Sequence, residues 1–309
     1  MSFLEQLGQV SPPGDTALTI GVFDGLHLGH QHLLSRLKAE AQERGLVPGV
    51  LTFRNHPRAV LHPGEEVGWL SDLDERLDLL RSTGLDLVVV VDFTRELSLL
   101  RPREFLSLLQ QRLRLRALVV GPDFALGYQR QGDRPTLEAL GREMGFTVTT
   151  VEHYMVDGVG VRSTHIRNLI SQGDVAGAAR MLGRNYSIRG IVVRGDGRGR
   201  RLGYPTANLA VDSQRLVPGN GIYATWAYVG DARYPAATSI GVRPTFGQGQ
   251  RTVESYLMDF SGVLYHKEMR LEFVRRLRDE LAFPSVEALV QQMGQDVAQA
   301  REVLAVGKR

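Results

Sequence analysis

The stretch GVFDGLHLGH, residues 21–30, marks the point where a predicted strand gives way to a predicted helix. Residues 17–23 are apolar and β-prone, whereas residues 30–42 repeat leucine and alanine at helical spacing. Between them, Asp24 and Gly25 form a turn signal, because glycine adopts backbone conformations that other residues avoid. The stretch therefore predicts a strand–turn–helix unit of the kind that builds parallel sheets.

Strand and helix patterns continue to alternate through the first half of the chain. Such alternation is typical of a Rossmann-like parallel sheet that helices cover on both faces. Ligands of these sheets bind at the carboxyl ends of the strands, so the turns at Asp24-Gly25, His56-Pro57 and Pro122-Asp123 should share one crevice. The predicted strands are residues 17–23, 47–53, 86–91, 117–121 and 146–151, and the predicted helices include residues 30–42, 73–80 and 102–115.

The pattern changes near residues 183–186, after two short predicted helices at residues 164–171 and 175–182. Short strands punctuated by Gly and Pro follow, which predicts a small antiparallel β-barrel, and an amphipathic helix from about residue 285 closes the chain. We therefore expect an α/β domain at residues 1–183 and a β-barrel domain at residues 184–309. The predicted barrel strands are residues 188–194, 222–229, 234–240, 252–258 and 269–274.

Composition limits the classes of function. The 309 residues exceed what one core usually serves, and the formal net charge is only +3. The one dense basic run, residues 194–201, is short and glycine-rich, which argues against a nucleic-acid partner. The absence of cysteine excludes disulfides and a cysteine nucleophile. No apolar run approaches the roughly 20 residues of a membrane span, and no signal peptide is evident, so a cytoplasmic location is expected.

Two histidines, His27 and His30, stand where the first helix is predicted to begin. A helix N-terminus offers free N–H groups and a partial positive charge, so two added imidazoles make a site suited to the phosphates of ATP. Gly25 and Gly29 would let the backbone approach those phosphates closely.

A metal site is the alternative for this histidine pair, with His32 and Asp24 as further zinc ligands. His32 is expected to point elsewhere on the helix, and no further ligand has metal spacing. The strand–turn–helix context therefore favours phosphate binding.

The first half resembles a known enzyme family. Residues 21–30 resemble the H-x-G-H signature of the nucleotidyltransferase superfamily. TFRNHP at residues 52–57 and GPDFALG at residues 121–127 narrow the resemblance to the adenylyltransferase half of bacterial bifunctional riboflavin kinase/FAD synthetase. RSTHIR at residues 162–167 is similar to the family's S-S-T-x-I-R, with Arg162 in place of the first Ser.

The resemblance implies adenylyl transfer, in which the FMN phosphate attacks the α-phosphorus of ATP and the protein orients both reactants. It implies that His27 and His30 hold the triphosphate and that Arg167 reaches the β- and γ-phosphates. Ser163 and Thr164 would cap the helix and contact ATP, although a plain N-cap is the alternative. The other implied binding residues are Gly21, Phe23, Asp24, Gly25, Gly29, Asn55 and Asp123, of which Asn55 and Asp123 are equally read as turn formers after strands.

The second half carries GIVVRGDGRGRRLGYPTANL at residues 190–209. Its glycines predict a mobile loop whose amides wrap phosphates, and its arginines supply charge. A glycine–arginine run alone is typical of a solvated loop or a weak nucleic-acid contact. The following PTAN, residues 205–208, resembles the riboflavin kinase motif. The resemblance implies ATP contacts from Gly195, Gly199, Arg200, Gly203, Pro205, Thr206 and Asn208, with Thr206 and Asn208 also giving oxygens to Mg²⁺.

A carboxylate completes the second candidate site. On the strand predicted over TVESYLMDF, residues 252–260, Val253 and Leu257 share one face, and Glu254 and Tyr256 share the other. By resemblance, Glu254 is the general base for the 5′-hydroxyl of riboflavin; a solvated surface glutamate is the alternative. Many relatives have His where Tyr256 stands. PGNGIYA at residues 218–224 and SIGVRPTF at residues 239–246 also look like family segments.

These motifs occur in family order over nearly the whole chain. The resemblance therefore implies a bifunctional enzyme that converts riboflavin to FMN and then FMN to FAD, with ATP as co-substrate, pyrophosphate as a product and Mg²⁺ in both steps. Three rivals remain open: an enzyme with one weakened half, a flavin- or nucleotide-sensing protein without turnover, and a nucleic-acid binder that uses residues 194–201. The oligomeric state is not predicted.

Overall fold

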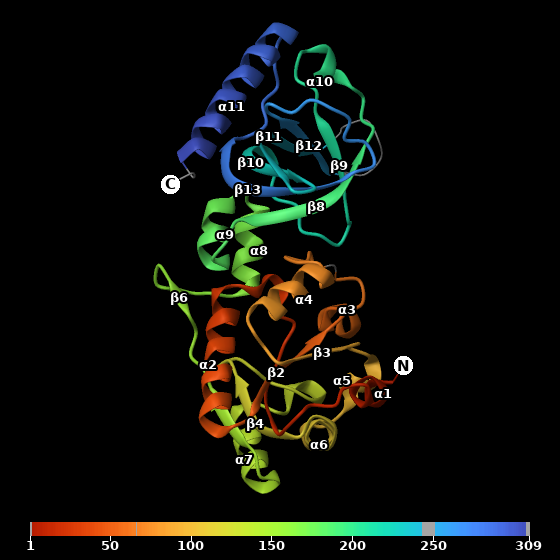
Figure 1. The fold of residues 1–309 in the computed structure, drawn as a ribbon, viewed down its shortest axis with the longest axis vertical. Helices are drawn as coiled ribbons and strands as arrows, with labels where there is room; N and C mark the ends of the chain where they lie inside the picture. Colours follow the sequence, from red (N-terminus) through yellow and green to blue (C-terminus); the bar gives the residue numbers. More distant parts are fainter. Residues whose placement is uncertain (1, 66, 243–250, 307–309) are drawn as a thin grey trace. The chain divides into compact units, whose positions relative to one another are not determined.

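The computed structural model describes residues 2–65, 67–242 and 251–306. By its internal contacts the chain divides into two compact units, Met1–Arg162 and Ser163–Arg309 (Figure 1). Helix α9 (Val175–Leu182) contacts the barrel strands β8 and β13, so the two short helices belong by contacts to the second unit. The domain boundary predicted after residue 183 stays a prediction, because a division by contacts does not show which segments fold as independent domains.

A parallel sheet forms the middle of the first unit. Its strand order is β3-β2-β1-β4-β5, and every pairing in it is parallel, which confirms the predicted Rossmann-like architecture. The order reverses between β1 and β4, and the carboxyl ends of strands beside such a switch point form a crevice. The strands are β1 (Thr16–Ile20), β2 (Val47–Phe53), β3 (Leu87–Val91), β4 (Leu115–Val120) and β5 (Thr147–Thr150).

Helices cover both faces of this sheet, because successive strand residues point to opposite sides. Leu18 and Leu51 are buried in one cluster with α6, whereas their neighbours Ala17 and Val50 are buried in another with α2. The other elements of the unit are α1 (Phe3–Gly8), η1 (Asp24–Leu26), α2 (Leu28–Arg44), α3 (Pro57–Leu61), α4 (Leu73–Ser82), α5 (Arg95–Leu99), α6 (Pro102–Leu113), η2 (Tyr128–Arg130), α7 (Arg134–Met144), β6 (Met155–Val156) and β7 (Val159–Gly160).

The second unit contains a closed antiparallel barrel with strand order β10-β11-β12-β9-β8-β13. The predicted barrel and closing helix are thus confirmed. Strand β9 was not among the predicted strands, because its first residues belong to a motif that reads as a polar turn. The elements are α8 (Ser163–Ser171), α9, β8 (Tyr186–Val193), α10 (Arg198–Arg201), β9 (Ala207–Val211), β10 (Gly221–Val229), β11 (Ala232–Val242), β12 (Arg251–Leu257), β13 (Glu268–Arg278) and α11 (Val286–Val306).

Strand β12 shows how the barrel presents side chains to its two faces. Val253, Ser255 and Leu257 are buried, whereas Glu254 and Tyr256 between them are half-buried, as the predicted alternation requires. Because the buried residues fill the barrel, Glu254 and Tyr256 face away from its interior. Helix α11 lies along the barrel and contacts β10, β11 and β13 (Figure 1).

Candidate functional site

The turn between β1 and α2 has the predicted strand–turn–helix form. Phe23 has φ 54° and Gly25 has φ 75°, and this pair of left-handed residues reverses the chain after β1. His27 is the N-cap of α2, and its Nδ1 accepts a hydrogen bond from the His30 N–H at 3.2 Å. One of the two histidines predicted to bind phosphate thus also caps the helix.

The imidazoles of His27 and His30 stack on each other, with ring centroids 3.6 Å apart and an interplanar angle of 15°. His27 is only 5% exposed, so the open side of the pair belongs to His30. The ring of Phe23 lies 5.1 Å from that of His30. A Cβ on Gly29 would lie 3.0 Å from the Val161 carbonyl oxygen, which explains glycine at this position.

Asp24 is buried inside the turn. Its carboxylate accepts hydrogen bonds from the N–H groups of Leu70 and Ser71 at 3.0 and 2.9 Å, and from the Ser71 hydroxyl at 3.1 Å. The Ser71 hydroxyl in turn accepts from the Gly25 N–H at 2.8 Å. These contacts support a role for Asp24 in fixing the turn.

The structure offers no support for the zinc alternative. Within the described residues, no group of three or more His, Cys, Asp or Glu side chains is placed to hold a metal ion. The ring of His32 packs near Tyr154, with centroids 5.6 Å apart. His32 thus points elsewhere, as the helical spacing predicted.

Asn55 connects the ends of two strands. Its Nδ2 donates to the Phe93 carbonyl, and its Oδ1 accepts from the Phe93 N–H, both at 2.8 Å. Both ends of the amide are thus used within the protein, which supports the turn-forming interpretation of Asn55. Gly21 lies so close to the Phe23 ring that a Cβ there would be 3.2 Å from it.

Asp123 belongs to an exposed polar cluster after β4 and β5. Its carboxylate lies 2.8 Å from the Arg162 guanidinium and 3.1 Å from His153 Nε2. Arg162 also lies 2.9 Å from His153. Arg162, which stands where the motif has its first Ser, is therefore paired with the carboxylate of Asp123.

Replacing Arg162 with Ser restores the motif hydroxyl and breaks this pair. Because exposed ion pairs contribute about 0–1 kcal/mol, the rate of FAD formation from FMN should change by less than about fivefold. The control is R103S, which breaks the exposed pair of Arg103 with Glu143 elsewhere in the unit. A loss above about tenfold in R162S alone would show that Arg162 contacts substrate, since it exceeds the worth of such a pair.

The second phosphate motif lies on α8. Ile166 and Ile170 are fully buried, whereas Ser163 and Arg167 are partly exposed and Thr164 is exposed. The motif thus presents its polar side chains away from the buried face of the helix. That Ser163, Thr164 and Arg167 contact ATP remains a prediction.

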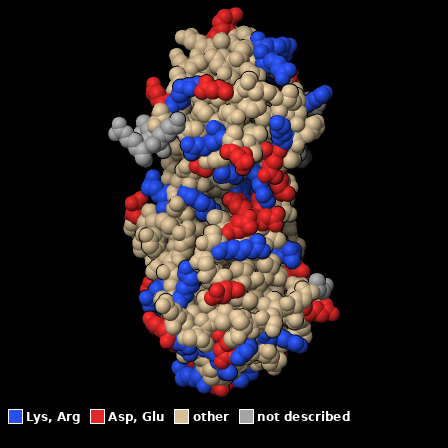
Figure 2. Space-filling view, in the orientation of Figure 1, with Lys and Arg blue, Asp and Glu red and all other residues tan. Residues whose placement is uncertain are grey.

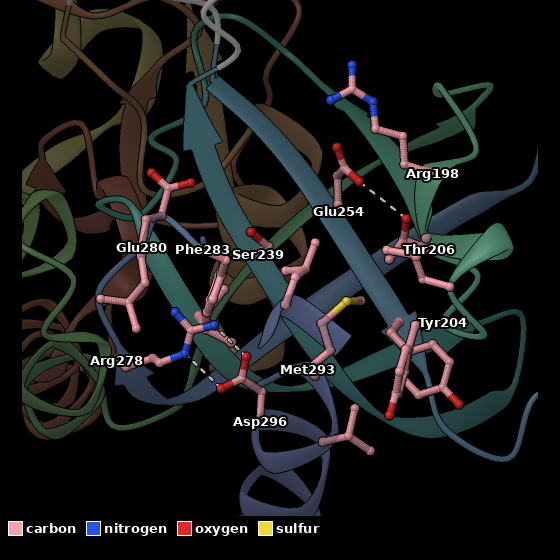
Figure 3. A pocket seen from close by; sticks show the side chains of 18 residues that line it. Arg198, Tyr204, Thr206, Ser239, Glu254, Arg278, Glu280, Phe283, Met293 and Asp296 are labelled. Atoms are coloured by element: carbon pink, nitrogen blue, oxygen red, sulfur yellow. Dashed lines mark hydrogen bonds and ion pairs between the residues drawn. The ribbon is translucent and has the colours of Figure 1, made fainter. Parts of the chain in front are cut away.

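A cavity of about 310 Å³ lies beside the barrel, between strand residues and α11. Figure 3 shows the carboxylate of Glu254 pointing toward Thr206, with Arg278 and Asp296 on the opposite side of the view. The Thr206 hydroxyl donates to Glu254 Oε2 at 3.2 Å. Polar lining residues include Arg198, Tyr204, Thr206, Ser239, Glu254 and Tyr256.

Strand register brings the predicted kinase residues together. Glu254 pairs with Asn208 of β9 on one side and with Ser239 of β11 on the other. A Cβ on Gly195 would lie 2.4 Å from the Asn208 side chain, and one on Gly199 would lie 2.3 Å from the Tyr204 carbonyl oxygen. These two glycines are therefore needed for close packing around the motif.

The remaining predicted residues of this loop surround the motif. The segment predicted as a loop forms a single helical turn, α10, on which Arg200 is exposed. Gly203 has φ 86° in the turn that follows, and Pro205 is exposed just before β9. The family-like segment at residues 239–246 is described only through Val242; Arg243, Pro244, Thr245 and Phe246 lie outside the described residues.

Arg278, near the end of the charged strand β13, is mostly buried rather than solvated. Its Nε and a terminal nitrogen lie 2.8 and 2.6 Å from the carboxylate of Asp296, which is 4% exposed on α11. Gln292 donates to the same carboxylate at 3.0 Å. An acidic residue on the apolar stripe of Met293 and Val297 was the signal that could have revealed this buried pair.

Two family models match the chain in succession. The FAD synthetase model matches residues 10–165, and the riboflavin kinase model matches residues 182–304. A bifunctional riboflavin kinase/FMN adenylyltransferase of Escherichia coli K12 is 34% identical over 96% of both chains. The chain belongs to this bifunctional family. The relatives from Pseudomonas fluorescens (37% identity, 93% of this chain and 92% of the relative) and Bacillus subtilis (33%, 92% and 91%) carry the same name.

The fold of the chain is also found in a solved structure. A solved structure from Streptococcus pneumoniae, described as a macrolide-efflux protein, matches with a TM-score of 0.89 and 28% identity over 96% of both chains. Among the described residues of the present chain, no helix has the length and apolar character needed to cross a membrane. The enzyme carries a riboflavin kinase domain and an FAD synthetase domain, and its reactions form FMN from riboflavin and FAD from FMN with ATP.

Proposed function

We propose that Glu254 is the general base of riboflavin phosphorylation and that the His27–His30 pair binds the ATP phosphates during adenylylation of FMN. The observation that carries the kinase assignment is the pairing of Glu254 with Thr206 at a cavity of about 310 Å³. A carboxylate that faces a cavity, rather than bulk solvent, favours the general-base interpretation over a solvated surface residue.

In the kinase step, Glu254 takes the proton of the riboflavin 5′-hydroxyl as that oxygen attacks the γ-phosphorus of ATP. The bond from the γ-phosphorus to the bridging oxygen breaks, and ADP leaves. Arg198, which lines the same cavity, supplies positive charge for the phosphates. The close packing of Gly195 on Asn208 and of Gly199 on Tyr204 holds the motif in place for this reaction.

Magnesium fits the oxygen atoms at this site. Thr206 and Glu254 are in hydrogen-bond contact, and Asn208 is the register partner of Glu254, so hard oxygen donors converge there. Mg²⁺ is usually held by one or two protein oxygens together with substrate phosphates and waters, so a dedicated cluster of acids is not required. We infer that Thr206 and Asn208 hold the ion, which would neutralise phosphate charge.

In the adenylyl step, an oxygen of the FMN phosphate attacks the α-phosphorus of ATP, and pyrophosphate leaves. His30 and the N-terminus of α2 face the charge that develops on the phosphates, with His27 stacked behind His30. Arg167, Ser163 and Thr164 are proposed as further phosphate contacts on the strength of the family motif. Asp24 and Asn55 act by fixing the turns, as their internal hydrogen bonds support.

Incubation with riboflavin, ATP and Mg²⁺, with chromatographic separation of the flavins, tests this function. FMN should appear first and FAD second. Removing divalent metal with EDTA should stop both steps, because both break a bond in the negatively charged triphosphate of ATP, and adding Mg²⁺ should restore them. Turnover that continues undiminished in EDTA would contradict the magnesium assignment, and FMN without FAD would contradict the adenylyl step.

The face of the molecule in Figure 2 gives no support to the nucleic-acid rival. On the face shown in Figure 2, the described Lys and Arg side chains are interspersed with Asp and Glu rather than gathered in one basic field. Phosphate-backbone binding depends on such concentrated positive charge. Small-molecule substrates remain the proposed partners, and a cytoplasmic location remains a prediction from the sequence.

A further inference from the structure

Arg76 of α4 is a buried charged residue of the first unit. It is only 1% exposed, which is rare for arginine. Burial lowers the pKa of Arg76, and the charges of Asp24 and Asp72 oppose that shift. Its Nε has no hydrogen-bond partner among the described residues. A buried guanidinium with an unmatched donor is a poor choice for stability alone.

The guanidinium joins segments that lie far apart in the sequence. One terminal nitrogen donates to the Val22 carbonyl at 3.1 Å, and the other donates to the carbonyls of Phe53 and Arg54 at 2.8 and 3.4 Å. The central carbon of the guanidinium lies 4.7 Å from the centroid of the Trp69 ring. Trp69 directly precedes Leu70 and Ser71, whose N–H groups donate to Asp24. Arg76 therefore ties together the exits of β1 and β2 and the segment that braces the turn.

The Val22 carbonyl is the contact that matters for the histidines. It also accepts from the Thr52 hydroxyl at 3.1 Å, so two donors hold the peptide that precedes Phe23. Phe23 has φ 54°, a conformation that a bulky residue keeps only when its surroundings enforce it. The Phe23 ring in turn lies 5.1 Å from the ring of His30.

We propose that Arg76 is a positioning residue for adenylyl transfer, which acts through the Val22 carbonyl and Phe23 on the orientation of His30. It touches neither ATP nor FMN. The inference rests on the proposed role of the histidine pair. It assigns a function in the adenylyl half to a residue outside every motif identified in the sequence.

The R76K variant tests the proposal, because lysine keeps the charge but lacks the planar fork that reaches two strands at once. The kcat for FAD formation from FMN should fall about 10- to 100-fold, since misplacement of reacting groups by about 1 Å costs this much. The KM for ATP should change less than kcat, and riboflavin phosphorylation by the same chain should be unaffected. R81K is the matched control, because Arg81 is on the same helix but exposed, in an ion pair with Asp78 at 3.4 Å.

A double-mutant cycle separates positioning from general structural support. If Arg76 acts through His30, R76K should have less than about a twofold effect in an H30A background, since residues that act as a unit are not additive. T52V, which removes the other donor to the Val22 carbonyl, should lower kcat in the same direction and also lose its effect in H30A.

Three results would overturn the proposal: an equal fold-loss from R76K with and without His30, no loss in R76K, or loss of the first unit's cooperative unfolding transition in R76K. Full activity in H30A alone would instead contradict the proposed role of the histidines. The failure of each hypothesis is thus recognised separately.

Discussion

The E254Q variant is expected to lose riboflavin kinase activity by about 10²- to 10⁴-fold, the usual contribution of a general base. Glutamine keeps the size of the side chain and can still accept a hydrogen bond from Thr206, but it cannot take the proton of the riboflavin hydroxyl. Formation of FAD from added FMN should remain at the wild-type rate, because Glu254 lies in the barrel unit. Both rates are measured on the same protein by separating the three flavins.

The matched control for E254Q is E268Q, at the first residue of β13, where the side chain is exposed. It should keep both activities. Kinase activity within about threefold of wild type in E254Q would contradict the general-base role, since a true base contributes at least about 10².

The H30A variant is expected to lower the rate of FAD formation by about 10²- to 10³-fold, the usual cost of removing one donor that stabilises charge in the transition state. The reason is geometric: His30 provides the open face of the stacked imidazole pair at the start of α2. Phosphorylation of riboflavin should be unchanged, so FMN should accumulate when riboflavin and ATP are supplied.

His32 supplies the matched control for H30A, because it lies on the same helix but packs near Tyr154. H32A should form FAD at nearly the wild-type rate. Equal losses in H30A and H32A would indicate damage to α2 rather than loss of a phosphate contact.

Most of the architecture was accessible from the sequence because strand and helix periodicities differ and alternate clearly. Residues 17–23 and 30–42 predicted β1 and α2 with only small errors at the boundaries. Strand β9 was missed because Pro205 and Thr206 read as a turn, and the segment is a strand through its pairing with β8 and β12. Such pairing is a long-range property that local propensity does not contain.

The candidate sites were predictable where the chemistry lies in one segment. The His27–His30 pair and the Thr206–Asn208 motif are examples, although their roles remain proposals. The internal contacts of Asn55 and Asp24 were not predictable, because their partners Phe93 and Ser71 lie far away along the chain. Buried polar groups must find partners, and the sequence does not say which.

The same limit explains why the sequence does not reveal the contacts of Arg76 and Arg278. Each is a single arginine in a helix or strand with other charges nearby, a pattern typical of solvated residues. The structure instead buries Arg76 against three carbonyls and pairs Arg278 with the buried Asp296. Only the packing of distant segments separates such residues from their exposed neighbours.

Mixing two inactivated variants tests the central claim that each half of the chain carries out one of the two reactions. Supplied with riboflavin, ATP and Mg²⁺, E254Q alone should leave riboflavin unchanged, and H30A alone should stop at FMN. An equimolar mixture should form FAD, because FMN released by H30A is a substrate for the intact adenylyltransferase of E254Q. No FAD from the mixture, together with no FAD from E254Q supplied directly with FMN, would contradict this division of labour.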